Sequence, residues 1–265
     1  MKRLLLLVTT LILAGSLFAQ PNDDNWRDGS AKQLKGKVFT VCCFVSAGKH
    51  SWKKDDKEVA LYKLREAYKW LQFQAESNGV KVNFYDTATS DDADIKVDKI
   101  YQWKGEGKDT GNLGLKVLQA AGHTDLMAYY DSLIKYTHCD NIQVILFTKM
   151  AGRSYACPYK KGMVKQKKFL ECVTVYETDY QGTEMRVATI AHEFLHLYGA
   201  WDLYQSHSQQ PNVEKKSKSI LGRSIMLETY AGLEGKIVDE VTAWLIGWFP
   251  TYYPFYENFR PKDRY

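Results

Sequence analysis

The stretch IQVILFT, residues 142–148, is apolar except at Gln143 and Thr148 and is rich in branched side chains. A short run of this kind predicts a β-strand buried on both faces, as in the centre of a largely parallel sheet. Similar patterns predict further strands before and after it. These lie at residues 37–45 (KVFTVCCFV), 80–85, 153–157 and 172–176, so five strands are expected.

Segments with apolar residues at helical spacing lie between and after these strands. The expected helices cover residues 55–77, 113–121, 124–137, 183–198 and 236–248, whereas residues 205–224 are polar and predict a loop. The helix at 183–198 has the strongest pattern, with Thr183 as its expected N-cap and Gly199 as its end. Strands that alternate with helices predict an α/β (α+β) fold.

The N-terminal segment has the pattern of a secretory signal peptide. A charged start, an apolar run and a small-residue end occupy residues 1–19, so cleavage after Ala19 is expected, with cleavage after Ser16 as the alternative. An uncleaved membrane anchor is the competing interpretation, but the run is shorter than a span of about 20 residues. We therefore expect a secreted or periplasmic protein with no membrane segment after signal removal. Residues 20–36 then form a short polar lead-in.

The charge balance argues against nucleic acid as a partner. The 265-residue chain has 36 basic and 31 acidic side chains and a net charge of +5. The signal segment holds Lys2, Arg3 and no acid, so the mature chain falls to +3, which is too little to favour a polyanion. The densest basic run, residues 160–168, has no interleaved stacking aromatics and predicts a solvated hairpin loop.

All five cysteines lie in the exported part, where disulfides can persist. Because five is an odd number, at least one thiol remains free or pairs between chains. Cys157 and Cys172 flank the expected hairpin and are the best candidates for a bridge. Cys42 and Cys43 are adjacent in an expected strand, so their side chains should point to opposite faces as buried thiols.

The motif HEFLHLYGAWD, residues 192–202, carries the chemistry. On a helix, His192 and His196 lie one turn apart on the same face, which lets two imidazoles reach one ion, and Glu193 projects beside them. Zinc suits these ligands, but a hydrolytic zinc site needs three protein ligands and one open position. Gly199 can turn the chain back sharply, which makes Asp202 the candidate third ligand. Its negative charge should make the ion a weaker Lewis acid than three histidines would.

Other interpretations of this motif remain open. A distant glutamate, Glu214 or Glu240, could be the third ligand, in which case an Asp202→Ala variant would still bind zinc. His207 is a further alternative, although it follows the turn late in the sequence. A metal-stabilised binding or adhesion domain with little turnover is the competing class of function, and the presence of Glu193 argues against it because binding alone needs no base.

The motif resembles the HExxHxxGxxH/D signature of the metzincin zinc endopeptidases, with aspartate in the third position as in the snapalysin-like minority. Members have a methionine-containing turn below the metal, and Met226 in the segment Arg223–Met226 fits that turn. Many members also place a tyrosine two residues after this methionine. Glu228 stands there in this chain, so Tyr230 is the candidate substitute as an oxyanion-stabilising residue.

The resemblance implies a fold as well. It implies a twisted five-stranded mixed sheet with one antiparallel edge strand, a long active-site helix, and a small C-terminal subdomain with the methionine turn and a terminal helix. The catalytic domain would span residues 37–265, with an upper subdomain at 37–199 and a lower one at 200–265. The run DNIQVILFTKMAGRSYACPY, residues 140–159, is similar to the strand-to-edge-strand passage of the reprolysin-like branch.

These features together predict a secreted zinc-dependent endopeptidase of the metalloendopeptidase class. Zn²⁺ held by His192, His196 and Asp202 would activate water, with Glu193 as general base. A polypeptide substrate would pair as an added strand with the edge strand. The residues expected to form that edge are Arg153, Ser154, Tyr155 and Ala156. We expect the protein to act as a monomer.

Overall fold

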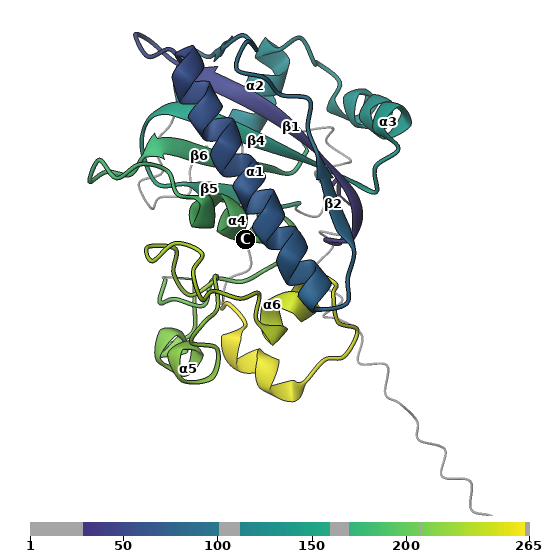
Figure 1. Ribbon diagram of the computed structural model, residues 1–265, viewed down its shortest axis with the longest axis vertical. Helices are drawn as coiled ribbons and strands as arrows, with labels where there is room; N and C mark the ends of the chain where they lie inside the picture. The colour runs from purple at the N-terminus through teal and green to yellow at the C-terminus, as the bar shows by residue number, and fades with distance from the viewer. Residues whose placement is uncertain (1–28, 101–111, 160–169, 207, 263–265) are drawn as a thin grey trace, which may run out of the picture.

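A computed structural model describes residues 29–100, 112–159, 170–206 and 208–262 (Figure 1). The predicted signal segment, residues 1–19, and the basic run at 160–168 lie outside these residues. The elements, in order, are β1 (Gly36–Ser46), α1 (Lys54–Ser77), β2 (Val82–Tyr85), β3 (Ile95–Lys96), α2 (Asn112–Ala120), α3 (Leu126–Thr137), β4 (Asn141–Ala151), β5 (Tyr155–Cys157), β6 (Cys172–Thr178), α4 (Val187–Leu197), α5 (Val213–Ile220), α6 (Glu240–Leu245) and the 3₁₀ helix η2 (Pro254–Phe259).

The strands form one mixed, mostly parallel sheet with the order β2-β1-β4-β6-β5. β4 lies in the middle, parallel to both β1 and β6, and its first eight residues are buried. β5 is antiparallel to β6 at one edge. The expectations of a buried central strand, an α/β class and an antiparallel edge strand are therefore confirmed.

The expected number of strands is wrong, because the sheet has six. The additional strand, β3, has only two residues and pairs with β1 through Val45 and Ile95. The surrounding sequence is acidic and polar, so it carries neither the length nor the alternation by which a strand is recognised. β3 belongs to the sheet only through its pairing with β1.

Helices cover both faces of the sheet. Alternate side chains of β4 point to opposite faces, so the strand contributes to a core on each side. Phe147 belongs to a core with Leu64 and Leu71 of α1 and with α4. Leu146 belongs to the second core, which α2 and α3 complete. Figure 1 shows α1 crossing one face of the sheet, while α5, α6 and η2 lie below the sheet.

Three helix predictions need correction. α4 begins at Val187, and Thr183 lies before it in a turn in which Asp179 accepts a hydrogen bond from the Thr183 N–H at 2.9 Å. The segment expected to be a loop contains α5, whose buried residues are Val213 and Ser217. A helix with so few buried positions leaves little apolar periodicity in the sequence.

The last predicted helix, at residues 236–248, is shorter in the structure than its apolar pattern predicts. α6 covers only Glu240–Leu245, and Asp239 caps it by accepting from the backbone N–H groups of Val241 and Thr242 at 3.0 Å. Residues 236–238 are extended instead, because Ile237 bonds to residues in the turn around Ser224. The terminal helix that follows α6, η2, is a 3₁₀ helix.

The described part of the lead-in is packed into the fold. Ala31 and Leu34 are fully buried. The Leu34 N–H donates to the Ile246 carbonyl at 3.0 Å, and the Trp248 indole N–H donates to the Leu34 carbonyl at 2.7 Å. This segment therefore ties the sheet to the end of α6.

Glu171, immediately before β6, is a fully buried carboxyl in contact with this lead-in. The Ser30 hydroxyl donates to it, and the Ala31 N–H donates at 3.3 Å. Burial raises the pKa of Glu171 from 4.5 to about 7, although the hydrogen bonds from Ser30 and Ala31 oppose the rise. The folded state thus holds this proton more tightly than the unfolded state does.

We expect the stability of the protein to fall as the pH rises from 4.5 to 7. In that window the unfolded chain ionises Glu171 while the folded chain keeps it neutral, which costs up to about 3 kcal/mol once both states are ionised. Urea unfolding at pH 5 and pH 8 of the wild type and of Glu171→Gln measures the effect. The variant should gain about that amount relative to the wild type between the two pH values; an unchanged difference would contradict the expectation.

The five cysteines are all free thiols in this structure. Cys157 and Cys172 are direct partners across the β5–β6 pair, but the bridge expected between them is not formed. Their thiols hydrogen-bond, and this contact together with burial raises the pKa of Cys172. Cys43 lies in the second core and Cys42 packs against the first, which confirms that they point to opposite faces.

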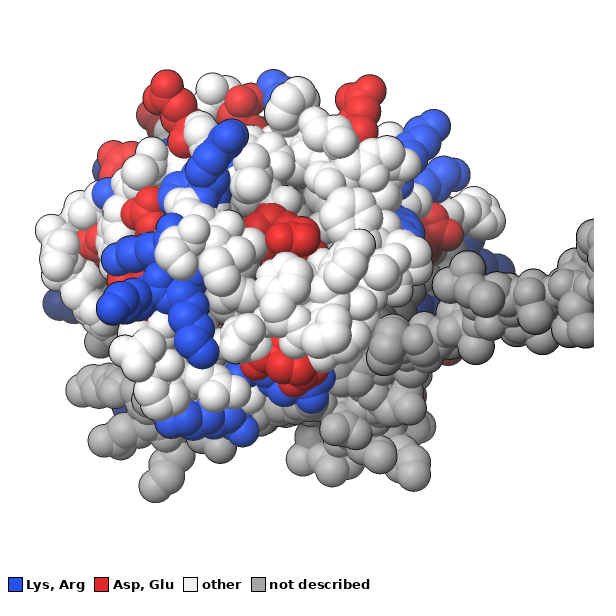
Figure 2. All heavy atoms as spheres, turned by 90° about the horizontal axis from the view of Figure 1, so that it is seen from below, with Lys and Arg blue, Asp and Glu red and all other residues white. Residues whose placement is uncertain are grey.

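The lower face of the molecule carries both signs of charge. Figure 2 shows this face, with Lys and Arg side chains gathered on the side where α5 lies in Figure 1. α5 contributes three exposed lysines there, Lys215, Lys216 and Lys218. Of the residues described, none belongs to a helix long and apolar enough to cross a membrane.

Candidate metal centre

The motif helix α4 is buried along almost its whole length. Every residue from Ile190 to Leu197 is buried, and α4 packs against α1, β5 and β6. Tyr198, at its end, donates its hydroxyl to Gln143 Oε1 of β4 at 3.0 Å. The polar residue inside the apolar central strand therefore anchors the C-terminal end of this helix.

The chain reverses directly after α4, as the sequence predicts. Gly199 has a φ of +97°, and the Ala200 N–H donates to the Leu195 carbonyl at 3.1 Å. This six-to-one hydrogen bond is the mark of a helix that ends on a left-handed glycine. The reversal returns Asp202 toward the helix that it has just left.

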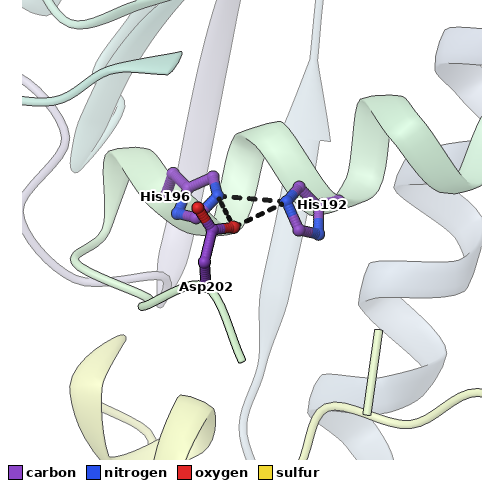
Figure 3. A group of neighbouring side chains, drawn as sticks. All are labelled: His192, His196 and Asp202. Carbon is purple, nitrogen blue, oxygen red and sulfur yellow. Dashed lines mark hydrogen bonds and ion pairs between the residues drawn. The ribbon is translucent and has the colours of Figure 1, made fainter. Parts of the chain in front are cut away.

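Three ligand atoms converge where the chain returns (Figure 3). His192 Nε2 and His196 Nε2 lie 3.1 Å apart, and Asp202 Oδ1 lies 3.3 Å from the first and 3.1 Å from the second. Ligand atoms about 2.0–2.1 Å from a tetrahedral zinc ion are separated by about 3.3 Å. The spacing of the three atoms therefore fits a single ion.

Both histidines direct Nε2, the nitrogen that would bind a metal, toward the cluster. His192 Nδ1 lies 3.1 Å from the Ile225 carbonyl, and His196 Nδ1 lies 2.8 Å from the Ala200 carbonyl. A carbonyl oxygen only accepts, so each Nδ1 carries the hydrogen, and in the neutral imidazole Nε2 has the lone pair. The backbone thus sets the tautomer that a metal ligand requires.

The pKa values of Asp202 and His196 reflect strong interactions between charges in the cluster. Burial raises the pKa of Asp202, but His196 and His192 outweigh that effect and hold it well below the usual range. Burial lowers the pKa of His196, yet Asp202 and Glu193 raise it to about 9. Lone pairs and a carboxylate oxygen this close repel one another unless a positive charge lies among them. A metal ion among the three atoms would supply such a charge.

Glu193 is buried beside the three ligand residues. The exposed fractions are 5% for His192, 7% for Glu193, 9% for His196 and 7% for Asp202. Burial raises the pKa of Glu193, while the two histidines lower it. A carboxylate whose pKa moves toward neutrality is suited to accept and return a proton.

Met226 is fully buried in a turn that supports the site. The Leu227 N–H donates to the Ser224 carbonyl at 3.2 Å, which closes the turn. The Leu203 N–H donates to the Met226 carbonyl at 3.0 Å, next to Asp202. Because the Ile225 carbonyl also contacts His192, this turn holds both a histidine and the returning segment.

Tyr230, the candidate oxyanion-stabilising residue, lies on the surface with 74% of its area exposed, and the Arg186 guanidinium lies 5.6 Å from its ring centre.

The two glutamates that are alternative third ligands have other surroundings. Glu214 accepts from the Gln205 N–H at 3.0 Å and pairs with Lys218, and Glu240 is exposed at the start of α6.

In the described parts of the chain, His192, His196 and Asp202 make the only cluster of three or more metal-ligand side chains, so this structure brings neither Glu214 nor Glu240 into it. His207 lies outside the described residues.

The expected edge residues are only partly in a strand. Tyr155 and Ala156 belong to β5, whereas Arg153 and Ser154 precede it. The Ser154 hydroxyl accepts from the Tyr176 N–H at 3.3 Å. Arg153 instead contacts Tyr204 beside the cluster: burial lowers the pKa of Arg153, but Tyr204 and, to a smaller extent, Asp202 and Glu193 raise it.

Tyr204 also lies beside the cluster, although no sequence motif predicts it. Its ring lies 6.4 Å from the His192 ring at an interplanar angle of 25°, and its hydroxyl accepts from Arg153 Nη2 at 2.8 Å. Burial and the charge of Asp202 raise the pKa of Tyr204, so its phenol stays protonated. The one indication in the sequence that Tyr204 lies near the cluster is its position two residues after Asp202.

No family model and no curated protein matches this sequence. A solved structure described as "Structure of a chaperone-substrate complex" is similar over 63% of this chain and 27% of that chain, with 12% identity and a TM-score of 0.29. So low a score carries no argument about function. The molecule is an α/β protein with a buried histidine–histidine–aspartate cluster.

Proposed function

We propose that this protein is a secreted zinc-dependent endopeptidase of the metzincin type. The observation that carries the proposal is the convergence of two imidazole nitrogens and a carboxylate oxygen within 3.1–3.3 Å of one another. Zinc is the natural occupant of a site with two histidines and one carboxylate. The glycine reversal and the buried Met226 turn support the family resemblance.

The residues of the site divide the chemistry among them. Bound zinc would lower the pKa of a water molecule and polarise the scissile carbonyl. Glu193 would accept a proton from the attacking water as the water oxygen bonds to the carbonyl carbon, and the carbon–nitrogen bond would then break. The same carboxyl returns the proton to the departing amine. His192, His196 and Asp202 would hold the ion.

An extended peptide is the substrate that the sheet favours. β5 is the edge strand and packs against α4, which holds the metal ligands. An edge strand presents unpaired backbone groups that bind another strand with little regard to its side chains. A polypeptide added along β5 would thus run beside the metal cluster.

The test is metal content combined with peptide cleavage. The chain from residue 20 onward, purified in zinc-containing buffer, should bind about one zinc ion and cut a mixed peptide library, as read by mass spectrometry. Cleavage should stop after metal removal with a chelator and return when zinc is added. Bound zinc without any cleavage would instead favour a metal-stabilised binding domain.

A further inference from the structure

Tyr204 and Arg153 reach the metal cluster from two different parts of the chain. Tyr204 follows Asp202 by two residues, while Arg153 follows β4. Arg153 Nη2 lies 2.8 Å from the Tyr204 hydroxyl, and its guanidinium lies 5.9 Å from the Tyr204 ring centre. The Asp202 carboxylate also interacts with the Tyr204 hydroxyl and, after burial, raises the pKa of that phenol.

The direction of these hydrogen bonds follows from their chemistry. Arginine can only donate, so the Tyr204 oxygen accepts from Arg153. The phenol hydrogen is then available to the Asp202 carboxylate, which can only accept. A donor chain therefore runs from Arg153 through Tyr204 to Asp202.

Backbone constraints hold both members of the pair. β4 is irregular between Thr148 and Ala151, and Gly152 follows. A Cβ on Gly152 would lie 2.4 Å from the Tyr176 ring, so only glycine lets the chain pass there and deliver Arg153. On the other side, the Leu203 N–H bond to the Met226 carbonyl holds the backbone just before Tyr204.

We propose that Arg153 and Tyr204 are positioning residues that orient the Asp202 carboxylate as the third metal ligand. This inference rests on the proposed metal site. A carboxylate can rotate and bind through either oxygen, so a hydrogen bond from Tyr204 selects one orientation. The positive charge of Arg153 also offsets part of the negative charge that Asp202 brings in place of a third histidine. Hydrogen-bond partners of metal ligands perform this role in many sites.

The test measures metal affinity directly, without substrate. Tyr204→Phe should weaken zinc binding roughly 10- to 100-fold in competition with a chromophoric chelator. Arg153→Gln, at an exposed position, should weaken it less. Tyr230→Phe is the matched control, because Tyr230 also lies beside an arginine, Arg186, but is exposed. The zinc affinity of this variant should equal that of the wild type.

A spectrum separates positioning from a general structural role. The visible absorption of the Co²⁺-loaded protein reports the coordination of the ion and should change in Tyr204→Phe but not in Tyr230→Phe. Unchanged zinc affinity and an unchanged Co²⁺ spectrum in both Tyr204→Phe and Arg153→Gln would overturn the inference, even if cleavage slowed. A wild type that binds zinc but cuts no peptide would refute the proposed function and leave the inference standing.

Discussion

An Asp202→Ala variant is expected to bind zinc at least roughly 100-fold more weakly than the wild type, since losing a ligand costs more than losing one of its hydrogen-bond partners. The change leaves only the two Nε2 atoms of His192 and His196, 3.1 Å apart. Two imidazoles cannot complete the three-ligand site that a hydrolytic zinc ion needs.

Chelator competition measures this loss, and Glu214→Ala is its control. Glu214 is the acid that a distant-ligand interpretation would use, but here it pairs with Lys218 and accepts from the Gln205 N–H. Its removal should leave zinc affinity unchanged. The opposite pattern, with zinc retained in Asp202→Ala and lost in Glu214→Ala, would show that the third ligand comes from elsewhere.

The second large effect concerns Glu193. Glu193→Gln should lower kcat for peptide cleavage by roughly 10²–10⁴-fold, because an amide cannot take up the proton of the attacking water. Glutamine has nearly the same shape, and Glu193 does not belong to the converging cluster, so zinc content should not fall. The measurement pairs metal analysis with initial rates on fluorescein-labelled casein.

A matched control for this variant is Glu171→Gln. Glu171 is also a buried glutamate with a raised pKa, but it contacts Ser30 and Ala31 at the far end of β6. Its replacement should leave kcat unchanged under conditions where both proteins are folded. Equal rates for Glu193→Gln and the wild type would remove Glu193 from the mechanism.

Much of the site was predictable because its signals are local. His192 and His196 face the same way on any helix, and glycine at 199 is a common way to end one. Asp202 could be proposed as a ligand from this geometry alone. In the same way, the apolar run in β4 predicted the centre of the sheet, because a strand buried on both faces has no polar side to show.

Contacts between distant segments could not be predicted in this way. Tyr204 and Arg153 are 51 residues apart, and no periodicity in either segment indicates that they meet. Only the distance from Met226 along the chain predicts a role for Tyr230, and in the structure Tyr230 lies on the surface near Arg186. Spacing along a loop does not define direction in space.

Local sequence specifies the helix with its two imidazoles, the reversal after it and the buried central strand, because each depends on residues that are near one another in the chain. Long-range packing sets which carbonyls orient His192 and His196, how the lead-in packs against Glu171, and which tyrosine lies beside Asp202. These contacts join parts of the chain that meet only when the sheet and the lower segment pack together, and no local pattern encodes that packing.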